Sequence, residues 1–298
     1  MEIRKIAVIG GGLMGGGIAH VAIEAGYDVI LNDVSMEFAQ KSKDGIVRWM
    51  DKDIAKGRMT AEAKEAALSH LTLSCDLEDI MDVDLVIEAI PEKIELKKSV
   101  FSKLSKICRE ETILATNTSA ISIAEIASVV KKPERVLGMH FVSPVQRMKL
   151  MEIVKTLATS EETIAYAREV AAKMGKTVIV AKDSPAFILN RMLDPMANEA
   201  ITIVELGIGS IEDVDTAMRV GLNHPVGPLE LMDMAGLNVL LDAINAIHNE
   251  TNDPKYKPSM LLRNMVRMGW WGKKTGKGFY IYHEDGTKTP NPDIDLAK

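Results

Sequence analysis

The chain contains few cysteines. There are two in 298 residues, Cys75 and Cys108, and neither belongs to a CxxC or Cys/His spacing. A disulfide framework or a structural zinc site needs several such residues at short intervals, so we expect neither. Two isolated thiols are typical of proteins in a reducing compartment.

The chain also lacks a surplus of positive charge and any long apolar run. Its 42 acidic residues outnumber 36 basic ones, for a formal net charge of −6. Binding to nucleic-acid phosphates needs an excess of Lys and Arg, so we expect no nucleic-acid partner. The apolar stretch 229–247 is interrupted by four Asp and Asn residues, which argues against a membrane span. The four apolar residues before the first glycine are too few for a signal-peptide core, so the expected location is the cytoplasm.

The first part of the chain alternates short apolar runs with helical patterns. Apolar runs at 4–9 and 27–32 flank a helical pattern at 13–25, which predicts a βαβ unit with parallel strands. Similar alternation continues to about residue 181. The sequence therefore predicts an α/β fold, with a Rossmann-like, doubly wound, mostly parallel sheet over residues 1–182.

The pattern changes near Ser184-Pro185, a pair typical of a helix start. Helical apolar spacing then covers 186–206, 211–220, 228–248 and 258–268, followed by a strand candidate at 278–282. We therefore expect an all-α C-terminal domain over 183–298. Its polar end, after Glu284, is expected to be a surface extension.

A glycine-rich turn follows the first strand. Residues 10–15 read Gly-Gly-Gly-Leu-Met-Gly, which fits GxGxxG, and Asp33 ends the next strand. Glycines let the backbone approach a pyrophosphate at a helix N-terminus, and the carboxylate would bind ribose hydroxyls while repelling a 2′-phosphate. The pattern favours a dinucleotide site for NAD over NADP, against a purely structural turn with a solvated Asp33.

Polar side chains near the ends of later strands are candidates for chemistry. His140 ends one strand, and Glu152 lies among apolar residues of the next, where an unpaired carboxylate is costly. A His–carboxylate pair would suit a general base, although a core histidine with an unrelated carboxylate gives the same pattern. Ser119 could bind a ligand or simply cap the following helix, and Asn190 alone is unremarkable.

Several ordered stretches together resemble the L-3-hydroxyacyl-CoA (3-hydroxybutyryl-CoA) dehydrogenase family over nearly the whole length. The stretches are 10–19 GGGLMGGGIA, 88–92 EAIPE, 115–119 ATNTS, 138–141 GMHF, 148–152 MKLME, 183–191 DSPAFILNR, 225–231 PVGPLEL and 274–280 KTGKGFY. The resemblance implies an N-terminal NAD domain, a helical C-terminal domain that makes most of a homodimer interface, an active site between them, and an acyl-CoA thioester substrate.

The resemblance also implies roles for individual residues. His140 would be the general base, Glu152 would orient it, and Ser119 and Asn190 would bind the reacting substrate oxygens. We expect cofactor contacts from the following positions: Gly10, Gly12, Leu13, Met14, Gly15, Asp33, Glu92, Lys97, Asn117, Ser119 and Ser143. No metal ligand is expected.

One segment departs from the family pattern. Where the family usually has Phe-Phe-Asn-Pro after the histidine, this chain has Phe141-Val142-Ser143-Pro144, followed by Gln146-Arg147. The shorter Ser143 leaves the hydride chemistry intact and suggests a bulkier or more polar acyl group. Basic residues at 41–58 either meet the CoA phosphates or form a solvated helix face. The alternatives are a dehydrogenase of a free hydroxy acid or sugar acid, one with another donor, and a non-enzymatic NAD-binding protein.

Overall fold

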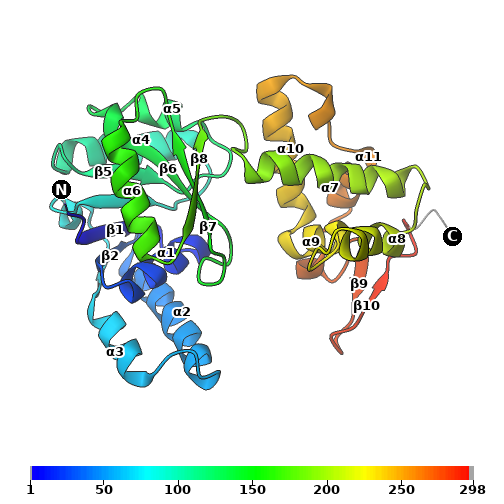
Figure 1. Ribbon diagram of the computed structural model, residues 1–298, viewed down its shortest axis with the longest axis horizontal. Coiled ribbons are helices and arrows are strands. Elements are labelled where there is room, and N and C mark those ends of the chain that lie inside the picture. The colour runs from blue at the N-terminus through cyan, green and yellow to red at the C-terminus, as the bar shows by residue number, and fades with distance from the viewer. Residues whose placement is uncertain (1, 295–298) are drawn as a thin grey trace. The chain divides into compact units, whose positions relative to one another are not determined.

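The chain forms two compact units. The computed structural model describes residues 2–294, and its units are Met1–Phe187 and Ile188–Lys298. In Figure 1 the first unit runs from blue to green and the second from yellow-green to red. The predicted boundary, between residues 182 and 183, falls slightly earlier in the chain.

The first unit is built on one eight-stranded sheet in the order β3-β2-β1-β4-β5-β6-β7-β8. All neighbouring strands are parallel except β6 and β7, which pair antiparallel across the short connection 142–149. The predicted doubly wound, mostly parallel sheet is confirmed. The strands are β1 (Lys5–Ile9), β2 (Asp28–Asn32), β3 (Leu71–Ser74), β4 (Leu85–Glu88), β5 (Ile113–Thr116), β6 (Val136–Phe141), β7 (Leu150–Lys155) and β8 (Thr177–Lys182).

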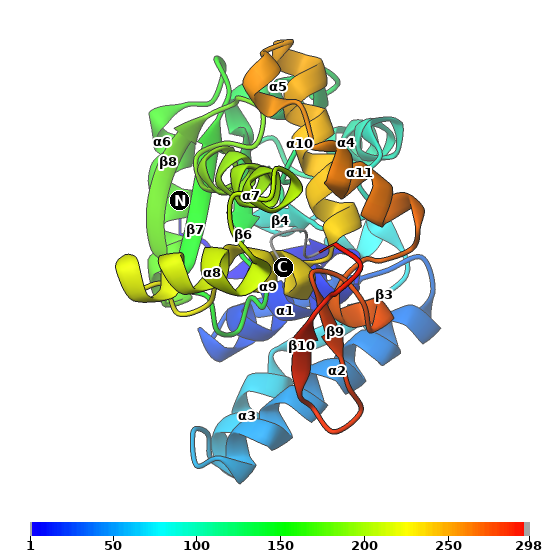
Figure 2. The same cartoon turned by 90° about the vertical axis from the view of Figure 1, so that its right-hand side faces the viewer.

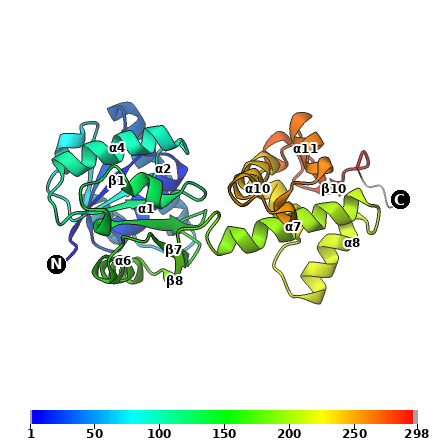
Figure 3. The ribbon, with the colours of Figure 1, turned by 90° about the horizontal axis from the view of Figure 1, so that it is seen from above.

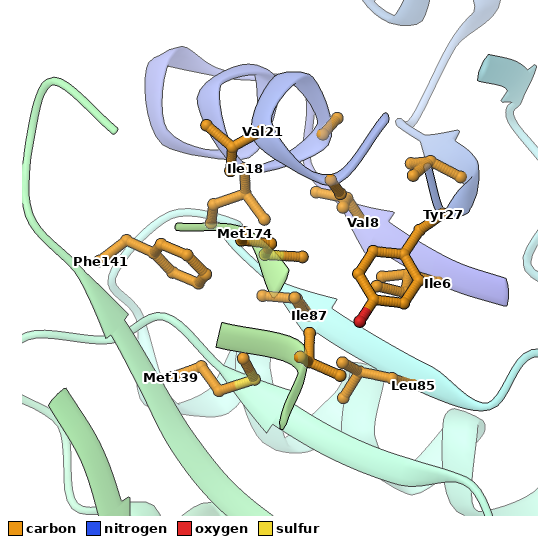
Figure 4. Close-up of a cluster of buried hydrophobic side chains, with 14 of the residues drawn as sticks. Ile6, Val8, Ile18, Val21, Tyr27, Leu85, Ile87, Met139, Phe141 and Met174 are labelled. Atoms are coloured by element: carbon orange, nitrogen blue, oxygen red, sulfur yellow. The ribbon is translucent and has the colours of Figure 1, made fainter. Parts of the chain in front are cut away.

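Helices cover both faces of this sheet, as a parallel sheet requires. They are α1 (Leu13–Glu24), α2 (Met36–Ala55), α3 (Ala61–Ser69), α4 (Ile94–Ile107), α5 (Ile123–Ala127) and α6 (Glu161–Lys173). Figure 3 shows α4 and α6 on opposite sides of the strands. One core packs α1 and α6 against the sheet (Figure 4), and the other packs α4 and α5 against its opposite face.

Helices α2 and α3 extend beyond the sheet as an arm (Figures 1 and 2). Each begins at a capping residue, because the Ser35 and Thr60 side chains accept hydrogen bonds from the backbone of Phe38 and Ala63. The basic residues of this arm lie on its surface, and all but the half-buried Lys43 and Lys64 are exposed.

The second unit is mainly helical. Its helices are α7 (Leu189–Glu205), α8 (Ile211–Thr216), α9 (Pro228–Ala235), α10 (Leu237–Thr251) and α11 (Met260–Arg267). Helix α7 packs against the other four around a core of its own. Strands β9 (Tyr280–Tyr282) and β10 (Lys288–Pro290) pair antiparallel as a hairpin (Figure 2), so the unit is not purely helical.

Three local predictions for the second half are wrong. The Ser184-Pro185 pair does not start a helix, because Ala186 and Phe187 have φ of 62° and 53° and α7 begins only at Leu189. The expected helix 228–248 is two helices, broken at Gly236 with φ of 104°.

The third concerns the segment after Glu284, which is not a simple surface extension. It contributes β10, and the amide of the fully buried Asn291 donates to the carbonyl of Gly278 at 2.8 Å. Within residues 2–294, no helix is long and apolar enough to cross a membrane.

Candidate active site

The glycine turn between β1 and α1 leaves open backbone at a helix N-terminus. Gly10 has φ of 93°, and a Cβ added to Gly15 would overlap the carbonyl oxygen of Gly10. A Cβ on Gly12, by contrast, would meet no protein atom within 4 Å. Gly12 and Leu13 are exposed, Met14 is half-buried, and the first turn of α1 carries no acidic side chain. Free N–H groups and the helix dipole therefore face space that a pyrophosphate fits.

Asp33 lies beside this turn. Its Oδ2 accepts from the backbone N–H of Gly11 at 2.6 Å, and its Oδ1 accepts from Val34 at 2.7 Å. A carboxylate has about four acceptor positions, so capacity remains for ribose hydroxyls. The turn and Asp33 together fit NAD on the geometry of the protein alone.

His140 and Glu152 lie directly opposite each other in the antiparallel β6–β7 pair. Residues so paired point to the same face of the sheet, which brings the side chains together. The Nδ1 atom of His140 is 2.7 Å from Oε2 of Glu152, and the Glu152 side chain is fully buried. The carboxylate fixes the ring with Nδ1 protonated, which leaves Nε2 as the basic atom.

The ring of Phe187 packs on the same imidazole. The ring centroids are 5.6 Å apart with an interplanar angle of 61°, and Phe187 is buried. This edge-on contact limits rotation of the His140 ring and keeps water from one side of it.

Ser119 follows β5 in a segment held by its backbone. The Ser119 N–H donates to Oε1 of Glu92 at 3.1 Å, and its half-buried hydroxyl makes no hydrogen bond to the described residues. Asn117, in the same segment, accepts from the N–H of Phe141 at 2.9 Å and so joins the ends of β5 and β6. Ser119 thus presents a free hydroxyl from a fixed backbone.

Glu92 is charged because of its neighbours. Burial would raise its pKa, but the ammonium of Lys97 and hydrogen bonds from Thr118 and Ser119 outweigh burial and lower that pKa below 4.5. The Lys97 Nζ lies 3.2 Å from Oε2 of Glu92 and 2.7 Å from Oε1 of Glu88.

The segment after β6 that differs from the family pattern contacts α2. The guanidinium of Arg147 donates to Asp53 and lies 5.5 Å from the Trp49 ring. Ser143 itself is exposed and joined to Pro144 by a cis peptide bond. Arg147 therefore connects this segment to the helical arm.

Asn190 belongs to the second unit, in the first turn of α7. It is half-buried there. Residues 2–294 contain no group of three or more His, Cys, Asp or Glu side chains placed to hold a metal ion.

Two residues of this site have no place in the sequence-based predictions. Glu88 ends the apolar strand β4, and a buried carboxylate there needs a partner, so the argument used for Glu152 would have found it. Phe187 gives no such signal, because an aromatic residue in an apolar stretch looks like ordinary core.

Models of known families match both units. The 3-hydroxyacyl-CoA dehydrogenase NAD-binding domain matches residues 5–184, and the C-terminal domain of the same family matches 187–282. A 3-hydroxybutyryl-CoA dehydrogenase of Bradyrhizobium diazoefficiens is 45% identical over 94% of this chain and 96% of its own length. A probable 3-hydroxybutyryl-CoA dehydrogenase of Bacillus subtilis is 44% identical over 95% of this chain and 99% of its own length.

A solved structure agrees with these matches. The crystal structure of (S)-3-hydroxybutyryl-CoA dehydrogenase from Ralstonia eutropha superposes with a TM-score of 0.93 at 39% identity, covering 95% of this chain and 100% of the other. Both domains of one family match this chain in order, and relatives align with it from end to end. The NAD-type turn beside Asp33 agrees with these matches. The chain is an NAD-dependent oxidoreductase that belongs to the 3-hydroxyacyl-CoA dehydrogenase family.

Proposed function

We propose that this protein oxidises L-3-hydroxyacyl-CoA thioesters to 3-ketoacyl-CoA with NAD, and catalyses the reverse reduction. The observation that carries the proposal is the His140–Glu152 pair at 2.7 Å, on a unit that also carries the glycine turn and Asp33. A hydroxyl oxidation needs a hydride acceptor and a base, and the chain has a place for each.

Each residue has its own role in the proposed oxidation. Bound NAD supplies the hydride acceptor for the third carbon of the substrate. Nε2 of His140 takes the proton of the 3-hydroxyl, and Glu152 stabilises the imidazolium that forms. In the reductive direction the same atom returns the proton to the carbonyl oxygen. General base catalysis of this kind contributes about 10²–10⁴-fold.

Ser119 and Asn190 are proposed to bind the reacting oxygens. The Ser119 hydroxyl makes no hydrogen bond to the described residues, so it is available to donate. An amide such as Asn190 can donate to a carbonyl as well. Gly10, Gly12, Leu13, Met14, Gly15 and Asp33 are proposed to contact the cofactor, with Glu92, Asn117 and Ser143 nearer the reacting end.

Lys97 is proposed to act on the cofactor through Glu92. Its Nζ has three acceptors within the protein, Glu88 at 2.7 Å, Glu92 at 3.2 Å and the Ile90 carbonyl at 3.3 Å. An ammonium has three protons, so all are accounted for.

We further propose that the protein is a homodimer located in the cytoplasm.

The competing activity is oxidation of a free hydroxy acid or sugar acid. NADH loss is measured with acetoacetyl-CoA and, in parallel, with free acetoacetate. The proposal expects rapid turnover of the thioester alone. Equal or greater turnover of the free acid would contradict it, and binding of NADH without turnover of either would remove acetoacetyl-CoA as a substrate.

A further inference from the structure

A buried carboxylate connects the two loops that follow β4 and β5. Glu88, the last residue of β4, is fully buried and so lies beyond direct reach of any substrate. Its Oε1 accepts from Nζ of Lys97 and from the N–H of Ile90, both at 2.7 Å. Its Oε2 accepts from the hydroxyl of Thr116, the last residue of β5, also at 2.7 Å. One oxygen of Glu88 therefore accepts hydrogen bonds from residues that follow β4, and the other accepts one from the last residue of β5.

The first arm runs through Lys97. Its buried ammonium joins Glu88 to Glu92, whose Oε2 is 3.2 Å away. The other oxygen of Glu92 accepts from the Thr118 hydroxyl and from the N–H groups of Ser119 at 3.1 Å and Ala120 at 3.4 Å. The arm thus ends on the backbone of the Ser119 loop.

The second arm reaches the same loop directly. The Thr116 hydroxyl donates to Glu88 and accepts from the N–H of Thr118 at 3.2 Å. Glu88 makes no hydrogen bond to Ser119 itself, yet both of its oxygens lead to the segment 118–120.

We infer that Glu88 and Thr116 are positioning residues that set the place of the Ser119 hydroxyl in the reaction, and this rests on the proposed function. Stability alone does not account for the buried pair. Replacing a buried ion pair with apolar residues is often neutral or stabilising, because both charges lose hydration. A reacting oxygen, however, must be held within about 1 Å, since a misplacement of that size can cost about 10²-fold in rate.

The chain offers a matched pair of variants. Thr116→Val removes one buried hydroxyl at the carboxyl end of β5. Thr112→Val removes another just before β5, where the hydroxyl donates to the Val83 carbonyl at 2.8 Å. Thr112→Val loses one buried hydrogen bond, whereas Thr116→Val loses those to Glu88 and Thr118, so both should lower Tm and Thr116→Val should lower it more. Only Thr116→Val should lower kcat, by about tenfold, because a small displacement of the Ser119 hydroxyl slows the reaction.

A double-mutant cycle separates positioning from general damage. Thr116→Val and Glu88→Gln are each combined with Ser119→Ala, and kcat on acetoacetyl-CoA is measured. If both act through Ser119, their effects in the Ser119→Ala background shrink to about twofold or less, because coupled residues are not additive. Thr116→Val keeps the test open should Glu88→Gln fail to fold.

The outcomes are distinct. Equal kcat for Thr116→Val and Thr112→Val, or full effects in the Ser119→Ala background, would overturn the positioning role. A harmless Ser119→Ala would instead overturn the role proposed for Ser119, and equal or greater turnover of free acetoacetate by the unaltered protein would overturn the proposed function on which this role rests.

Discussion

Gly12 and Gly15 share one turn but differ in what surrounds an added side chain. A Cβ on Gly15 would overlap protein backbone, whereas one on Gly12 would enter space free of protein atoms within 4 Å. Gly12 has φ of −65°, which any residue adopts. The structure itself therefore does not require glycine at position 12, which agrees with the cofactor contact proposed there.

The substitution Gly12→Ala tests this reading. The protein should fold with nearly unchanged stability, and its Kd for NAD should rise by about tenfold or more, because the methyl group enters the place of the pyrophosphate. Titration of NADH fluorescence and urea unfolding measure the two quantities. Gly45→Ala, within α2 and free of clashes, is the control that should leave NAD affinity unchanged. Unchanged affinity in Gly12→Ala would place the cofactor elsewhere.

At the scale of single residues, the sequence identifies polar side chains that lie among apolar neighbours. Such a side chain is expected to have a partner, because burying it alone is energetically costly. Glu152 lies among apolar residues, and the structure places it against His140. The sequence cannot show which of two neighbouring carboxylates is buried. Glu88 and Glu92 are four residues apart, yet one is buried beneath the loop and the other contacts Ser119.

At the scale of elements, the link between β8 and α7 differs most from expectation. Ala186 and Phe187 both have left-handed φ values, and this conformation places the Phe187 ring against His140. Left-handed backbone costs an L-residue about 1–2 kcal/mol. Ser184-Pro185 is a good helix start in isolation, but the left-handed backbone at Ala186 and Phe187 delays the helix to Leu189.

Ala186→Gly should therefore cost little stability. Relief of the left-handed strain, about 1–2 kcal/mol, offsets the added flexibility of glycine, about 0.5–1 kcal/mol, and the loss of a buried methyl group, about 0.8 kcal/mol. Urea unfolding measures the net change in the free energy of unfolding. Ala165→Gly, exposed in the middle of α6, has helical backbone and should lose about 1 kcal/mol instead. A loss in Ala186→Gly as large as that in Ala165→Gly would show that this link is not strained.

Helices and strands can be predicted where one apolar periodicity continues along the sequence. They cannot be predicted where a local backbone conformation ends an element without changing that periodicity. The strands of the sheet follow buried apolar runs, so their order along the chain was accessible from sequence. The break at Gly236 lies inside an unbroken helical pattern, because Gly236 turns the chain with φ of 104° while its neighbours stay apolar. Strand β10 is polar and is specified by pairing with β9.

For the whole molecule, buried carboxylates of the second unit link stability to pH. Burial raises the pKa of Asp194 to about 7 and that of Asp233 to about 6, and it also raises the pKa of Asp215. Such groups bind protons more tightly when folded than when unfolded. Their contribution to stability is therefore complete below pH about 4 and is lost as pH rises through the folded pKa values.

We expect the free energy of unfolding to fall between pH 5 and pH 8. Asp194→Asn should reduce that fall by about 1–3 kcal/mol, because each unit of pKa difference corresponds to about 1.4 kcal/mol. Asp194 is the cleaner target, since its Oδ2 is buried without a hydrogen-bond partner among the described residues. Urea unfolding at the two pH values measures the difference, with the exposed Glu199→Gln on the same helix as control. If the free energy of unfolding of Asp194→Asn fell as much between the two pH values as that of the unaltered protein, Asp194 would be excluded as a cause of the fall.

The proposed activity of the whole chain depends on His140 as the base. The direct measurement is kcat for acetoacetyl-CoA reduction by His140→Gln, with NADH affinity determined on the same preparation. The account predicts a loss of about 10²–10⁴-fold in kcat with nearly unchanged NADH binding. Turnover within a few-fold of the unaltered protein would contradict it, because the proton would then be carried by another group.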